Sequence, residues 1–167
     1  MRRETFVTVE NILRDFPRVC ESLRQREQYL ESIARNSFNV GAAVVSGGDK
    51  LSSPELKTDI KINDAEYNEL LSIVEILSDR LYELPATLFN IIKMFYFEGL
   101  MDFEVANNVN YSDRCVKGHR LRAIRLLVDP CLSVHRVVER WRQREKTRQL
   151  RIMTGIFDNF TKKYLNV

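Results

Sequence analysis

Basic side chains gather in one short stretch of this chain, and their types and spacing could bind a polyanion. The stretch combines a serine, an aspartate, five cations and a glycine, at Ser112, Asp113, Arg114, Lys117, Gly118, Arg120, Arg122 and Arg125. Lysine and arginine bind phosphate, and the planar guanidinium of arginine can also donate two hydrogen bonds to one guanine. The stretch therefore indicates contact with a nucleic acid.

The distribution of charge along the chain supports this interpretation. The formal net charge is only +3 over 167 residues. Residues 1–110, however, carry 12 Lys and Arg against 18 Asp and Glu, whereas residues 111–167 carry 14 against 5. A basic segment on an acidic body favours a polyanionic partner, most often nucleic acid. The alternative is a solvated helix whose charge has no dedicated partner.

Three helices are predicted around the basic stretch, over residues 86–97, 102–109 and 112–127. Gly99 suits the left-handed conformation that closes the first helix, and Ser112 is the expected N-cap of the third. The inward residues of the third helix are expected to be Val116, Ala123, Ile124 and Leu127. A short helix, a tight turn and a basic helix together are the sequence form of a helix-turn-helix.

A series of short motifs runs through residues 84–127. It consists of Leu84-Pro85, Tyr96-Phe97-Glu98-Gly99-Leu100, Glu104-Val105-Ala106, and Ser112 followed by Val116-Lys117. This series resembles DNA-binding region 4 of bacterial sigma factors. Over its full length the chain is similar to the sigma-region-4-like transcription activators of temperate phages, the ArpU/RinA group. That second resemblance rests on an N-terminal helical segment, a connector with serine and proline, and the segment Tyr111-Ser112-Asp113-Arg114-Cys115-Val116.

The resemblance is specific over residues 84–127, weak over 1–83 and absent from 128–167. No segment corresponds to sigma region 2, so we expect the chain not to be a complete sigma factor. Matched position by position, the outward-facing set is Asp113, Arg114, Lys117 and Gly118, then Arg120, Arg122 and Arg125.

The resemblance assigns a role to several of these residues. Arg114 is expected to read guanine and Asp113 to accept a hydrogen bond from cytosine. The cations expected to bind phosphate are Lys117, Arg122 and Arg125. We expect His119 to be a partly buried packing residue, with a phosphate contact as the alternative.

Two positions depart from the family pattern. Met101 stands where such motifs have a Ser or Thr cap, so Asp102 is expected to cap the second helix or its start to fray. Gly118 lies inside the third helix and costs it about 1 kcal/mol relative to alanine. We interpret Gly118 as a place where the backbone lies close to DNA, with a tolerated defect as the alternative.

Two apolar stripes with alternating steps of three and four predict further helices. The first is Phe6, Val9, Leu13, Phe16, Cys20, Leu23, Glu27, Leu30 and Ala34, and the second is Tyr67, Leu70, Val74, Leu77, Leu81 and Leu84. Pro17 is expected to kink the first helix or begin a new one, and Asp64 to cap the second. The stripes can pair within the chain as an antiparallel hairpin or between two chains as a dimer, and each leucine can also be ordinary core.

The segments between and after these helices differ in composition. Residues 36–63 hold three glycines, one proline and four serines, which predicts a flexible connector with a short strand or turn at Val40–Val45. Asp129-Pro130 is expected to end the DNA-binding domain, and Ser133 to cap a further helix.

The C-terminal segment is basic and ends in apolar residues. Candidates for extra phosphate contacts are Arg140, Arg144 and Arg148, with docking on an acidic partner or a solvated helix as alternatives. The tail carries Ile156, Phe157, Phe160, Tyr164 and Leu165, which we expect to be covered by this chain or another.

Together these features predict an all-α chain in four parts. The parts are an N-terminal helical segment (1–35), the connector (36–63), a long helix with the helix-turn-helix (64–127) and a basic helical extension (128–167). No apolar run could span a membrane, and the start of the chain lacks a signal-peptide pattern. With three unpaired cysteines, this favours the cytoplasm, here of a bacterial host cell.

Enzymatic activity is not expected. The sequence has two histidines and lacks metal-ligand spacing, a phosphate-binding loop and a nucleophile–base set, so we expect no metal, cofactor or catalytic residue.

The leading hypothesis is a sequence-specific regulator that activates phage late or packaging genes, with double-stranded DNA and host RNA polymerase as partners. One alternative is a small terminase subunit, which also joins a helix-turn-helix to oligomerising helices. The other is an interaction protein of the same fold that does not bind DNA.

Overall fold

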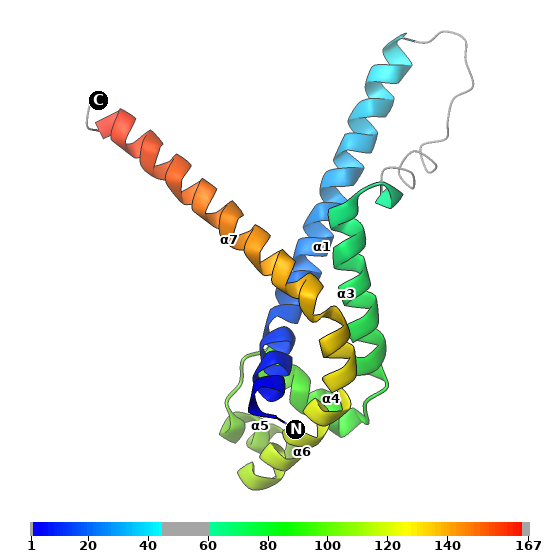
Figure 1. Ribbon diagram of the computed structural model, residues 1–167, viewed down its shortest axis with the longest axis vertical. Helices are drawn as coiled ribbons and strands as arrows, with labels where there is room; N and C mark the ends of the chain where they lie inside the picture. The colour runs from blue at the N-terminus through cyan, green and yellow to red at the C-terminus, as the bar shows by residue number, and fades with distance from the viewer. Residues whose placement is uncertain (1, 45–60, 165–167) are drawn as a thin grey trace.

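The computed structural model describes residues 2–44 and 61–164, with side chains described for 2–36 and 61–154. Its elements are α1 (Arg3–Val44), α3 (Ala65–Tyr82), α4 (Ala86–Ile92), the π-helical turn η1 (Lys93–Phe97), α5 (Asp102–Val109), α6 (Asp113–Leu126) and α7 (Val128–Tyr164). Over these residues there is no strand, which confirms the predicted all-α fold (Figure 1). None of the described helices is long and apolar enough to cross a membrane.

The first helix is longer than the sequence indicated. Pro17 lies inside α1 rather than beginning a new helix, because the loss of one backbone hydrogen bond is offset by burial of Phe16 and Val19 on either side. The helix also runs to Val44, so residues 36–44 belong to it and not to the connector. The strand or turn considered at Val40–Val45 is therefore wrong over residues 40–44, where Gly41 is the sole glycine or proline.

The two apolar stripes pair within the chain. α1 and α3 lie side by side and run in opposite directions (Figure 1), and α7 crosses them both. The stripe residues Leu13 and Leu77 are fully buried, but so are Ile12 and Ile73 outside the stripes. The buried faces are wider than a coiled-coil seam because α1 contacts α3, α7 and η1 together. These residues are thus unavailable for the predicted dimer, and self-association through another surface stays a prediction.

One core joins three of the predicted parts of the chain. Its members include Val9, Leu13 and Phe16 of α1, Leu70, Ile73 and Leu77 of α3, and Val134, Val138 and Trp141 of α7. The indole nitrogen of Trp141 also donates a hydrogen bond to Ser22 Oγ at 3.3 Å. The first part of α7 is therefore core and not an appended extension.

The start of α7 corrects a predicted boundary. This helix begins at Val128, directly after α6, so Asp129-Pro130 does not end the domain. Proline is tolerated in a first helical turn, where its missing N–H has no partner to lose. Ser133 does not cap a helix, and its hydroxyl instead donates to the carbonyl of Pro130 at 2.7 Å inside the helix.

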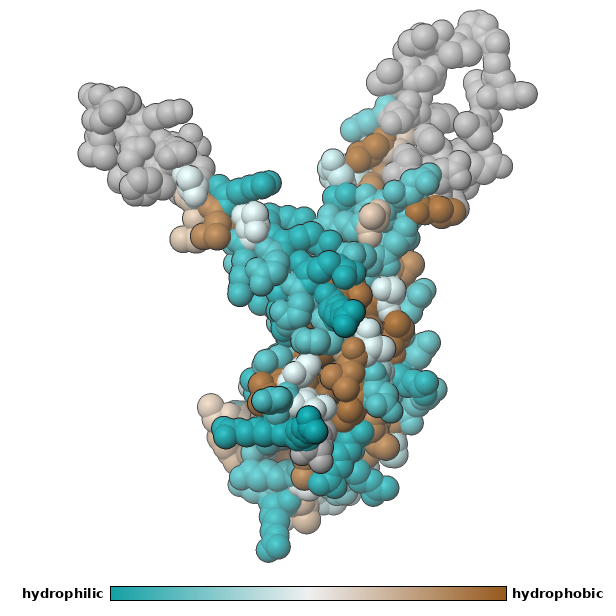
Figure 2. All heavy atoms as spheres, viewed as in Figure 1, coloured by the Kyte–Doolittle hydropathy of each residue, from teal (hydrophilic) through white to brown (hydrophobic). Residues whose placement is uncertain are grey.

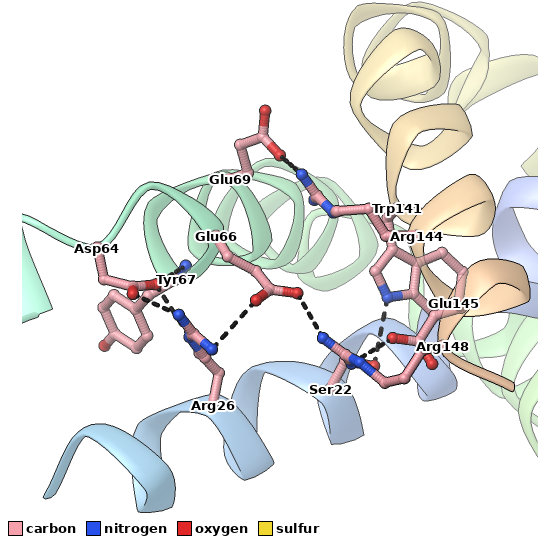
Figure 3. Close-up of polar contacts among 10 residues, drawn as sticks. All are labelled: Ser22, Arg26, Asp64, Glu66, Tyr67, Glu69, Trp141, Arg144, Glu145 and Arg148. Carbon is pink, nitrogen blue, oxygen red and sulfur yellow. Dashed lines mark hydrogen bonds and ion pairs between the residues drawn. The ribbon is translucent and has the colours of Figure 1, made fainter. Parts of the chain in front are cut away.

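The beginning of α3 is fixed by the predicted Asp64 cap and by an ion pair. Asp64 accepts a hydrogen bond from the backbone N–H of Tyr67 at 2.7 Å, which confirms the predicted cap. Its carboxylate also binds the Arg26 guanidinium at 2.6 Å, and the same guanidinium pairs with Glu66 at 3.2 Å (Figure 3). Arg26 thereby ties the middle of α1 to the start of α3.

These contacts make the stability of the fold depend on pH. The hydrogen bond from Arg26, and to a lesser extent that from Tyr67, lowers the pKa of Asp64 despite its partial burial. Because the folded-state pKa is lowered, the stabilisation is present above about pH 4 and is lost as the pH falls through the folded-state value.

Two substitutions at Asp64 separate its cap from its ion pair. Asp64→Ala removes both and should lower the free energy of unfolding by about 1 kcal/mol or more at pH 7. Asp64→Asn retains a good capping side chain and should cost less. Urea denaturation at pH 7 and pH 3 measures both variants, and the deficit of Asp64→Asn should shrink at pH 3. An equal loss for the two variants at pH 7 would contradict a stabilising cap.

Candidate nucleic-acid interface

Two left-handed residues shape the turns around the helix-turn-helix. Gly99 closes the preceding element at φ 74°, as predicted, and Asn110 at φ 55° ends α5. Two residues later Ser112 Oγ accepts a hydrogen bond from the backbone N–H of Cys115 at 3.3 Å. The predicted cap of α6 is thereby confirmed.

Helix α6 is held at both of its ends by buried residues. In its first half Val116 packs with Val105 and Ala106 of α5 and Ile91 of α4 in a small second core. In its second half Ala123, Ile124 and the following Leu127 join the main core. The four inward residues predicted for this helix are all buried.

The start of α5 differs from the expectation. Met101 occupies the N-cap position, and Asp102 is the first helical residue rather than the cap. The carboxylate of Glu104 compensates, because it accepts a hydrogen bond from the backbone N–H of Met101 at 2.7 Å. Asp102 is thus left free to face α6.

The outer face of α6 carries most of the predicted contact residues. Exposed positions are Ser112, Asp113, Arg114, Lys117, Gly118, Arg122 and Arg125. Four of these, at 114, 118, 122 and 125, recur at helical spacing and so share one side. At Gly118 no atom lies within 4 Å of where a Cβ would stand, so the fold itself does not require glycine there. Figure 2 shows mainly hydrophilic residues over the end of the molecule where α5, α6 and the start of α1 lie (Figure 1).

Arg120 was expected to face outward, and this prediction is wrong. Its side chain is only 18% exposed. It lies one turn from Val116 and one turn from Ile124, both fully buried, so it shares their face. Its guanidinium donates to Asp102 Oδ1 at 2.7 Å and lies 4.0 Å from the ring centroid of Phe95.

Two neighbours of Arg120 on α6, Lys117 and His119, differ in their exposure to solvent. Lys117 is 58% exposed, and its Nζ is 3.8 Å from the other carboxylate oxygen of Asp102. His119 is half-buried, with its ring 5.4 Å from that of Tyr111, which confirms the packing interpretation.

The π-helical turn connects this region to α1. The turn replaces the end of the helix predicted over 86–97. Phe95 lies under Arg120, whereas the next residue, Tyr96, is buried and donates through its hydroxyl to Glu10 Oε1 at 2.7 Å. Burial first, and then the Glu10 carboxylate, raise the pKa of Tyr96 above its ordinary value, so it stays a donor.

The three arginines of α7 proposed for phosphate already have partners within the chain. Arg144 binds Glu69 of α3 at 2.6 Å, and Arg148 binds Glu66 at 3.0 Å (Figure 3). Arg140 binds Glu69 as well, at 2.9 Å. Burial opposes the charge of Glu69, but the two guanidinium groups outweigh it and lower its pKa. The acidic surface on which these arginines dock is therefore α3 of the same chain. A phosphate would have to displace those carboxylates.

The other end of α7 is less fully described. Leu150, Ile152 and Met153 are exposed, and the helix leads away from α1 and α3 there (Figure 1). The tail side chains singled out in the sequence lie outside the described residues. In the described part of the chain, no three His, Cys, Asp or Glu residues are grouped as a metal site would require.

Comparison with known proteins gives a limited set of relatives. No protein-family model and no solved structure matches the chain. Three curated relatives from Paraclostridium sordellii, each named RNA polymerase sigma factor TcsR, are 27% identical over 128 residues. The match covers 76% of this chain and 73% to 75% of the relatives. This similarity supports the resemblance to sigma factors, whereas the resemblance to phage activators stays a prediction.

Gly118→Ala separates the two interpretations of the glycine in α6. Because space is available, alanine should raise the free energy of unfolding by about 1 kcal/mol. A close approach of the backbone to DNA would make the same methyl group weaken binding severalfold. Thermal denaturation and fluorescence anisotropy with a labelled duplex measure the two effects. Raised stability with unchanged affinity would favour a tolerated defect and contradict the close approach.

Proposed function

We propose that this protein is a sequence-specific DNA-binding transcription regulator that acts with RNA polymerase, and that α6 enters the major groove. The observation that carries the proposal is the outer face of α6. Among the described residues, Arg114, Arg122 and Arg125 are exposed cations without an ion-pair or hydrogen-bond partner. They stand on a helix whose opposite face is buried in two cores.

The contrast with α7 favours α6 as the DNA contact. An arginine that is already bound to a carboxylate must lose that partner before it binds phosphate, whereas a free arginine only exchanges water and counterions. The cations of α7 at 140, 144 and 148 are paired with α3. These three arginines are therefore less available to DNA than the unpaired Arg114, Arg122 and Arg125 of α6.

The polymerase part of the proposal rests on the relatives, which are named RNA polymerase sigma factors. Within this class we propose an activator of phage late or packaging genes in the cytoplasm of a bacterial host, as the resemblance to the ArpU/RinA group implies. A small terminase subunit is the second candidate, because it would use the same helix-turn-helix. The mass of the protein in solution discriminates them, since a ring of many copies would favour the terminase.

Selection of bound duplexes from a random pool tests the DNA part directly. We expect one preferred sequence, protected in a footprint and bound with strong salt dependence. Cys115 gives a second readout, because it is exposed at the start of α6, whereas burial raises the pKa of Cys131 to about 12. The selected duplex should slow alkylation of Cys115. If no preferred sequence were selected and the duplex did not protect Cys115, the proposal would be contradicted.

Arg114→Ala and Lys117→Ala should have different consequences for recognition. Loss of a guanine-reading arginine should relax sequence preference at one position by about 1–3 kcal/mol. Loss of a phosphate-binding lysine should weaken selected and random duplexes alike and reduce the slope of log affinity against log salt by about 0.9. Titrations at several salt concentrations distinguish the two. Equal losses on selected and random duplexes for Arg114→Ala would contradict its assignment as a base-reading residue.

A further inference from the structure

The partly buried Arg120 of α6 has the geometry of an orienting contact. Arg120 projects from the middle of the buried face of α6, and it meets Asp102 at the start of α5 and Phe95 in η1. Three elements thus converge on one guanidinium. The planar guanidinium fork donates its hydrogen bonds in fixed directions, whereas an apolar side chain makes contacts that have no preferred direction.

The apolar packing around this contact is small. The second core, which the first half of α6 joins through Val116, holds only four buried residues. The other three are Ile91 of α4 and Val105 and Ala106 of α5. Hydrophobic burial is non-directional, so it holds α6 against α5 but constrains its rotation weakly. A charge-assisted hydrogen bond of 2.7 Å between Asp102 and Arg120 supplies the missing direction.

The contact also continues toward α1. Phe95 meets Tyr96 edge to face with 4.9 Å between ring centroids, and the hydroxyl of Tyr96 reaches Glu10 of α1 at 2.7 Å. These contacts link the orientation of α6 to the main core as well as to α5.

We infer that Asp102 and Arg120 are positioning residues for DNA reading: their ion pair over Phe95 sets the orientation in which α6 presents Arg114 and Gly118 to the bases. This inference rests on the proposed function. Reading a base edge requires a bidentate geometry that a small rotation of the helix destroys, whereas a phosphate contact by a long side chain tolerates it. Loss of the ion pair should therefore reduce specificity and leave general affinity for DNA intact.

Arg120→Met tests this role, because methionine keeps an apolar stem and loses the fork and charge. We expect affinity for the selected duplex to fall about tenfold, affinity for random duplex to stay unchanged, and the salt slope to stay unchanged. Arg122→Met is the matched control on the exposed face. It should weaken both duplexes and reduce the slope by about 0.9.

Two outcomes would overturn the inference. A reduced salt slope for Arg120→Met, with equal losses on both duplexes, would make Arg120 a phosphate ligand. An unchanged ratio of selected to random affinity in a folded variant would reduce its role to stability. Arg120→Lys adds a check, since it restores the charge without the fork and should not restore specificity.

Amide hydrogen exchange separates this inference from the proposed function. In the absence of DNA, Arg120→Met should accelerate exchange in the first half of α6 and leave α3 unchanged. If the wild-type protein bound no DNA, the proposed function would fail, yet this readout would still report whether Arg120 holds α6. Unaltered exchange in α6 would contradict the positioning role by itself.

Discussion

Burial of α1 between α3, α7 and the π-helical turn is the constraint on which the rest of the structure depends. Each large apolar side chain buried there, such as Leu13 or Ile73, contributes roughly 1.5–3 kcal/mol. An exposed ion pair contributes about 1 kcal/mol at most. The apolar contacts therefore decide the arrangement, and the ion pairs select among the orientations that it allows. Because Ala123 and Ile124 of α6 join this core, the N-terminal helix helps to hold α6.

The same arrangement divides the basic half of the chain into two populations. Arg140, Arg144 and Arg148 of α7 meet the carboxylates of Glu66 and Glu69 and hold α7 against α3. Arg114, Arg122 and Arg125 on the outer face of α6 are exposed and have no such partners among the described residues. The net charge of the C-terminal segment therefore overstates the charge that is free to meet a polyanion.

Local features of the structure could be predicted from the sequence, and long-range ones could not. The Ser112 cap, the left-handed Gly99 and the inward face of α6 follow from spacing and residue type over a few positions. Position-by-position matching to the family pattern places Arg120 outward, although it lies one turn from two buried residues, Val116 and Ile124. The α3 partners of Arg140 and Arg148 lie 71 or more residues away along the chain, and no local sequence pattern predicts these pairs. Pro17 was expected to interrupt α1 because its tertiary contacts were not visible from the sequence.

The central claim is that DNA meets the outer face of α6 and not the arginines of α7. Titration of isotope-labelled protein with its selected duplex, followed through backbone amide chemical shifts, tests this most directly. The account predicts shifts at Arg114, Gly118 and Arg122, with Arg140 and Arg144 unchanged. Shifts centred on Arg140 and Arg144, with α6 unchanged, would contradict it.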